Sequence, residues 1–144
     1  MNILGVGLKR LDLQKRAVVF FEDSVLLLRN KRYSSSYYLA GYAVELGLKS
    51  CIARQIGSET IPDKTFMKNI FNHDFTTLVG LAGLKSELKE SQDKDSDFAS
   101  FWGIVGEWTP DSRYNTIDPT SCQLMLTAIG EKKSGVMKWI KTYW

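Results

Sequence analysis

The sequence has 144 residues, the usual size of a single domain. Hydrophobic residues make up 44% of it and charged residues 24%, a balance that argues against a disordered chain and against a membrane protein. The net charge of +3 is too small to indicate nucleic-acid binding by itself, so any basic surface must be local. We expect one domain over residues 1–144.

The sequence offers no membrane span and no secretion signal. No apolar run approaches the roughly 18 residues of a membrane span. The apolar start of the chain precedes Lys9 and Arg10, which is the reverse of the order in a secretion signal. We therefore expect a cytoplasmic protein.

Cysteine and histidine are scarce. Cys51 and Cys122 each fall within an apolar helical pattern, and neither has a second Cys or a His at metal-ligand spacing. We expect both to be reduced core residues, and we expect no metal and no cofactor. Because His73 is the single histidine, one protomer cannot form a metal centre with several histidine ligands, and a His-dependent catalytic pair within it would have to use His73.

Two long helices are predicted in the first part of the chain. Apolar residues recur at steps of three and four over residues 10–30, which predicts an amphipathic helix. A second helix is predicted over residues 34–56, with serines available as N-caps and Gly57 as a stop. Small residues on this second helix, Ala40, Gly41, Ala43 and Gly47, would let a neighbouring helix approach closely. We therefore expect the second helix to be central.

The middle of the chain predicts shorter elements. A helical turn is expected over residues 64–71 with Asp63 as N-cap, and a short helix over residues 74–84. The charged stretch of residues 85–97 has no sustained periodicity and is interpreted as an exposed polar linker. A further helix over residues 98–108 should end before Pro110.

Asp118 and Pro119 form the clearest helix start in the chain, a capping aspartate followed by proline at the first helical position. The helix is expected to continue to Tyr143. Together these elements predict an all-α protein, an antiparallel bundle of four to five helices. The absence of a βαβ pattern or of a Gly-rich loop after a strand argues against a dinucleotide-binding or P-loop protein.

Three segments carry a family resemblance. The stretch Tyr42–Lys49 reads Tyr-Ala-Val-Glu-Leu-Gly-Leu-Lys, His73 begins a His-Asp-Phe motif, and Trp108 precedes Arg113-Tyr114 by five residues. In content and order these segments resemble the HEPN family of helical bundles, which is related to the C-terminal helical domain of kanamycin nucleotidyltransferase-like proteins. The resemblance covers most of the chain.

The resemblance implies frequent homodimers and occurrence beside nucleotidyltransferases or within toxin–antitoxin and phage-defence operons. Many HEPN proteins are metal-independent ribonucleases that use an Arg followed, four to six residues later, by a His. Arg stabilises phosphate charge in such a site, and His handles the proton of the attacking 2′-hydroxyl. Here Arg113 could supply the Arg, but Asp118, Pro119 and Thr120 occupy the positions of the His. His73 follows Lys68 rather than an Arg, so the ribonuclease motif is degenerate.

Three functions follow as hypotheses. The first is a non-catalytic module that binds a nucleotide, RNA or a partner protein, with Arg113, Tyr114, Glu45 and Lys49 as candidate contacts. The second is a divergent ribonuclease that uses Arg113, Tyr114, Glu45 and His73. The third is a structural adaptor that binds a helix of a partner.

Glu45 is the candidate with the sharpest alternatives. It lies one helical turn before Lys49, so an exposed ion pair is the simple interpretation. It also lies in an apolar stretch, where a buried carboxylate would need a partner, and we expect that partner to be Arg113 with Tyr114 nearby. For His73 the ordinary interpretation is a structural hydrogen bond near a helix start.

Two clusters combine basic and aromatic residues. Arg29, Lys31 and Arg32 precede Tyr33, and the end of the chain carries Lys132, Lys133, Lys138 and Lys141 with Trp139, Tyr143 and Trp144. Such clusters could hold phosphates and stack bases. The alternative is that the lysines are solvated and the aromatic rings pack in the core.

Overall fold

The computed structural model describes residues 8–144, which form eight α-helices and one 3₁₀ helix and contain no strand. The elements are α1 (Arg10–Arg29), α2 (Tyr33–Ala53), α3 (Lys64–Ile70), α4 (Phe75–Leu81), α5 (Lys85–Lys94), α6 (Ser96–Gly106), η1 (Pro110–Tyr114), α7 (Pro119–Gly130) and α8 (Val136–Tyr143). The predicted all-α bundle is confirmed, with several short helices added to the long ones. No helix in the described range is both long and apolar enough to cross a membrane.

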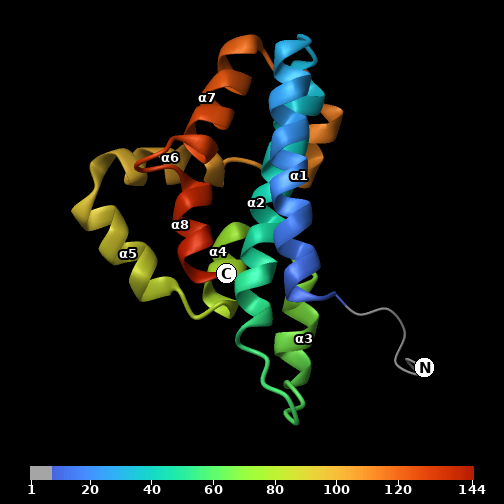
Figure 1. The fold of residues 1–144 in the computed structure, drawn as a ribbon, viewed down its shortest axis with the longest axis vertical. Coiled ribbons are helices and arrows are strands. Elements are labelled where there is room, and N and C mark those ends of the chain that lie inside the picture. The colour runs from blue at the N-terminus through green and yellow to red at the C-terminus, as the bar shows by residue number, and fades with distance from the viewer. Residues whose placement is uncertain (1–7) are drawn as a thin grey trace.

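The two longest helices, α1 and α2, run antiparallel and pack along their length (Figure 1). The turn between them is tight. Lys31 has a φ of 59°, and the backbone amides of Lys31 and Arg32 donate to the carbonyls of Leu28 and Leu27, the two bonds of a Schellman motif. Below the turn, the Ser36 hydroxyl donates to the Ser24 carbonyl at 2.6 Å in the buried seam between the helices.

Helix α2 is central, as predicted, because α1, α4, α7, α8 and η1 all pack on it. Its glycines admit neighbours of the same chain. A Cβ at Gly41 would lie 2.2 Å from the Trp108 indole nitrogen, and a Cβ at Gly47 would lie 3.0 Å from the Ile140 side chain. The small residues of α2 therefore serve packing within the protomer.

The expected linker over residues 85–97 is instead largely helical. Helix α5 buries none of its residues, which is why its sequence shows no apolar periodicity. Exposed pairs one turn apart, Lys89 with Asp93 and Lys94 with Glu90, support it weakly. The next residue, Asp95, caps α6 by accepting from the amides of Asp97 and Phe98.

The C-terminal third also departs from the prediction, because the single helix expected from Pro119 to Tyr143 is broken. Asp118 caps α7 as predicted, accepting from the Ser121 amide. After Gly130 the Glu131 carboxylate accepts from the amides of Lys133 and Ser134, which closes a turn. A Cβ at Gly135 would lie 2.3 Å from the Glu131 carbonyl oxygen, so only glycine fits this turn.

Candidate polar site on the second helix

A row of polar side chains runs along one face of α2. Tyr38, Tyr42, Glu45 and Lys49 follow one another at steps of four, three and four residues, which places them on one side of the helix. The lower end of this row carries the Glu45 network, which we define as Glu45, Lys49 and His73. The upper end lies beside η1.

Glu45 is buried, with 1% of its side chain exposed, and each of its carboxylate oxygens has a partner. The Lys49 ammonium lies 3.1 Å from one oxygen and is itself only 10% exposed. His73 Nδ1 lies 2.7 Å from the other oxygen. Because an unpaired buried charge is costly, these two contacts make the position of Glu45 tolerable.

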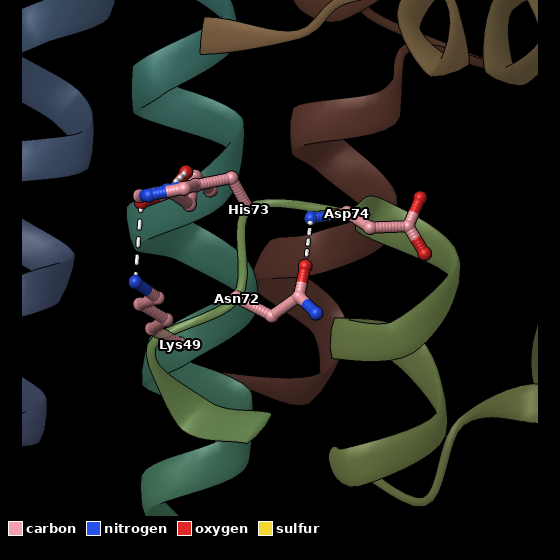
Figure 2. A network of polar contacts seen from close by, with 5 residues as sticks. Lys49, Asn72, His73 and Asp74 are labelled. Carbon is pink, nitrogen blue, oxygen red and sulfur yellow. Dashed lines mark hydrogen bonds and ion pairs between the residues drawn. The ribbon is translucent and has the colours of Figure 1, made fainter. Parts of the chain in front are cut away.

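His73 reaches Glu45 from the loop between α3 and α4. Figure 2 shows its side chain extending from that loop toward α2, with Asn72 and Asp74 on either side. The Asn72 side chain accepts from the Asp74 amide at 2.8 Å, and Asp74 caps α4 by accepting from the Thr77 amide at 3.0 Å. These bonds fix the loop, so His73 is directed at the carboxylate by local backbone structure.

The Glu45 network leaves one nitrogen of the His73 imidazole free of the contact with Glu45. Glu45 occupies Nδ1 of His73, which leaves Nε2 as the imidazole nitrogen without that contact, and 51% of the His73 side chain is exposed. A carboxylate that orients an imidazole is also the arrangement by which enzymes position a proton-transferring His. The network can therefore hold the loop on α2, and it presents one oriented imidazole to solvent.

Arg113 lies elsewhere, on the Arg113 surface, which we define as Arg113, Tyr114 and Tyr38. The Arg113 guanidinium lies 4.8 Å from the centroid of the Tyr114 ring, and 75% of Tyr114 is exposed. Hydrogen bonding to Tyr114, and to a smaller extent to Tyr38, raises the already high pKa of Arg113. The surface therefore offers a permanent positive charge beside one exposed aromatic ring, that of Tyr114, and one partly buried ring, that of Tyr38.

Trp108 connects the two regions. Its ring is 3% exposed, stacks on Phe75 at 5.4 Å and 2° between planes, and contacts Tyr38 at 6.1 Å. It enters the notch left by Gly41 on α2. Its indole nitrogen has no hydrogen-bond partner, so packing is what holds it there.

The predicted pair of Glu45 and Arg113 is wrong. The oxygens of Glu45 are occupied by Lys49 and His73, and Arg113 is exposed beside Tyr38, seven residues or roughly 10 Å along α2 from Glu45. The simpler prediction, a pair of Glu45 with Lys49, is confirmed, although the pair is buried. The hydrogen bond expected for His73 near a helix start is present, but its partner, Glu45, was not predicted. The signal that pointed to this partner was the need of a buried carboxylate for a second contact in a chain with one histidine.

The other candidates take ordinary places in the structure. Trp139 is 8% exposed and its indole donates to the Ser91 hydroxyl at 3.0 Å, so its ring does not offer a stacking face. Cys51 and Cys122 are buried free thiols, and burial raises the pKa of Cys51 to about 12. Across residues 8–144 no three His, Cys, Asp or Glu side chains gather in a way that could hold a metal ion.

A comparison of the chain with protein-family models, characterised proteins and solved structures finds no match.

Proposed function

We propose that this protein is a non-catalytic, HEPN-like module of a prokaryotic toxin–antitoxin or defence system that binds single-stranded RNA through the Arg113 surface in the cytoplasm. One observation carries the proposal. Within the described chain, Arg113 forms no ion pair with a carboxylate, and it lies 4.8 Å over the ring of the exposed Tyr114.

The chemistry of the Arg113 surface suits a nucleic-acid backbone and base. Guanidinium groups bind phosphate oxygens in a bidentate manner, and an unpaired guanidinium need not leave a protein carboxylate to do so. An exposed aromatic ring can stack a base, a contact that contributes about 1–3 kcal/mol. The small net charge of +3 implies binding of modest affinity that weakens with salt.

The Glu45 network supports the Arg113 surface in this proposal. It holds the start of α4 against α2, α4 supplies Phe75, and Phe75 stacks on Trp108, which in turn contacts Tyr38. Glu45 and Lys49 then act on ligand binding only through packing. A nucleotidyltransferase or another defence protein remains the predicted partner.

The test is fluorescence anisotropy with a labelled single-stranded RNA at several salt concentrations. Arg113→Gln should weaken binding about tenfold, the loss of one charge-assisted contact of about 1.4 kcal/mol, and should lower the salt dependence. Tyr114→Ala should weaken binding by a similar factor. Arg10→Gln is the matched control, because it removes the same charge from an exposed site at the far end of the α1–α2 pair. Equal effects of Arg10→Gln and Arg113→Gln would contradict a specific surface.

A ribonuclease is the second candidate, favoured by the imidazole of His73 that Glu45 orients. Such an enzyme needs a phosphate-binding Arg in the same cleft, and the row on α2 separates Arg113 from this imidazole within one chain. We therefore expect no efficient metal-independent cleavage of RNA. Cleavage by the purified protein that is lost in both His73→Asn and Arg113→Gln, with the fold retained, would establish the enzyme instead.

A further inference from the structure

Helix α1 has an outward face that no described element covers. The helix packs chiefly on α2, with a minor contact to α7. Along its opposite side Leu11, Val19 and Leu26 are exposed by 59%, 49% and 58%. Their steps of eight and seven residues keep them on one stripe, which we call the α1 stripe. A helix of this length is roughly 30 Å long, so the stripe runs along much of the molecule.

The charges beside the α1 stripe have a symmetric order. Lys15 and Arg16 lie four and three residues before Val19, and Glu22 and Asp23 lie three and four residues after it. All four side chains belong to exposed residues, and within residues 8–144 none of them forms an ion pair. Basic and acidic groups thus stand at equal distances on either side of one apolar residue.

This order is complementary to itself under a twofold rotation. If a second copy of α1 lies antiparallel with the axis at Val19, Lys15 faces Glu22 of that copy along one flank of the stripe and Arg16 faces Asp23 along the other. The rotation generates the same two pairs a second time on the other side of the axis. Leu11 then falls opposite the level of Leu26. An interface about a twofold axis needs one surface that matches itself, and charged flanks of this kind fix the orientation of paired helices.

We infer that two copies of this protein associate through the α1 stripe, antiparallel about Val19. The argument rests on α1 alone and does not depend on the proposed RNA binding. The expected contact is a single pair of helices, so the dimer should form in the micromolar range. A like-charged or parallel arrangement would place Lys15 beside Lys15 of the second copy.

The test uses two charge-reversal variants, alone and mixed. The dimer dissociation constant of each sample is measured by sedimentation velocity across micromolar concentrations. The Lys15→Glu/Arg16→Glu variant and the Glu22→Lys/Asp23→Lys variant should each raise the dimer dissociation constant at least tenfold, because each makes all four flanking charges alike. An equimolar mixture of the two variants should recover dimer formation, and so should the variant that combines all four changes. Lys89→Glu, a reversal at an exposed site on α5, should leave the wild-type value unchanged.

Several results would overturn the inference. A wild-type chain that stays monomeric throughout this range would leave the stripe to a different partner, and variants that dimerise like the wild type would place the interface elsewhere. Failure of the mixture and of the fourfold variant to recover dimers would exclude the antiparallel pairing. A far-ultraviolet circular dichroism spectrum like that of the wild type confirms folding of each variant.

Discussion

Replacing Lys49 by Met should destabilise the protein far more than replacing an ordinary surface lysine. The change keeps the length of the side chain and removes the ammonium that lies 3.1 Å from Glu45. The carboxylate remains buried, with only 1% of the side chain exposed. Its negative charge then depends on the single contact with His73.

The loss of unfolding free energy expected for Lys49→Met lies between the values typical of a buried and of an exposed ion pair. Removing one partner of a fully buried ion pair costs about 3–5 kcal/mol, and losing an exposed pair costs about 0–1 kcal/mol. Glu45 keeps His73, and the half-exposed His73 side of the network admits water. We therefore expect Lys49→Met to lower the free energy of unfolding by about 2–3 kcal/mol. His73→Ala should cost less, about 1–2 kcal/mol, because water can replace the exposed imidazole.

The assay is urea denaturation followed by circular dichroism, applied to Glu45→Gln, Lys49→Met and the double variant. Glu45→Gln removes the charge, so the loss of Lys49 should matter much less in that background, and the coupling should exceed about 1 kcal/mol. Lys89→Met is the matched control, since Lys89 pairs with Asp93 at the same spacing but is 78% exposed. Effects of the single changes that add within about 0.5 kcal/mol would refute the reasoning.

Two further predictions concern the packing and the turns. Gly41→Ala should destabilise the protein by about 1–3 kcal/mol and alter tryptophan fluorescence, because its Cβ would meet the Trp108 ring at 2.2 Å, whereas Gly103→Ala meets nothing within 4 Å and should stabilise by up to about 1 kcal/mol. Equal effects of the two would contradict the close fit. Amide hydrogen bonds from Ser134 and then Lys133 lower the pKa of Glu131, so its contribution is present above the ordinary value of 4.5 and is lost as the pH falls through the lowered folded-state pKa. Urea titrations over this acidic range should show a shallower loss of stability in Glu131→Gln, and an unchanged slope would exclude the role.

The helices and their starts could be predicted where the signal is local. Apolar periodicity identified α1 and α2, and Asp63 and Asp118 cap α3 and α7 as their spacing indicated. For Glu45 the local pattern left two interpretations open, an exposed pair with Lys49 and a buried carboxylate among apolar neighbours, and the structure shows the pair with Lys49 in a buried position. Each of these features depends on residues within a few turns of one helix.

What could not be predicted depends on contacts between distant residues. The partner of Glu45 required knowledge that the loop after α3 folds back on α2, and Arg113 was an equally good candidate by charge. At the break between α7 and α8 the Glu131 side chain accepts from the backbone amides of Lys133 and Ser134, and helical periodicity does not report such a contact. Helix α5 has no fully buried residue, so its sequence carries no apolar periodicity that would distinguish it from a linker.

Glu45 and Arg113 do not touch, yet a chain of contacts joins them. The Glu45–His73 contact ties the start of α4 to α2, and α4 places Phe75 under Trp108. The Trp108 ring packs against Gly41 of α2. Two residues after Trp108 the chain enters η1, which carries Arg113. Hydrogen bonds and ion pairs depend on orientation, whereas the hydrophobic effect does not. The two polar contacts of the buried Glu45 carboxylate therefore define the position of α4 on α2 more closely than apolar packing alone would. The coupling that the sequence suggested between the two residues is therefore expected to act through the packing of Trp108 rather than through an ion pair.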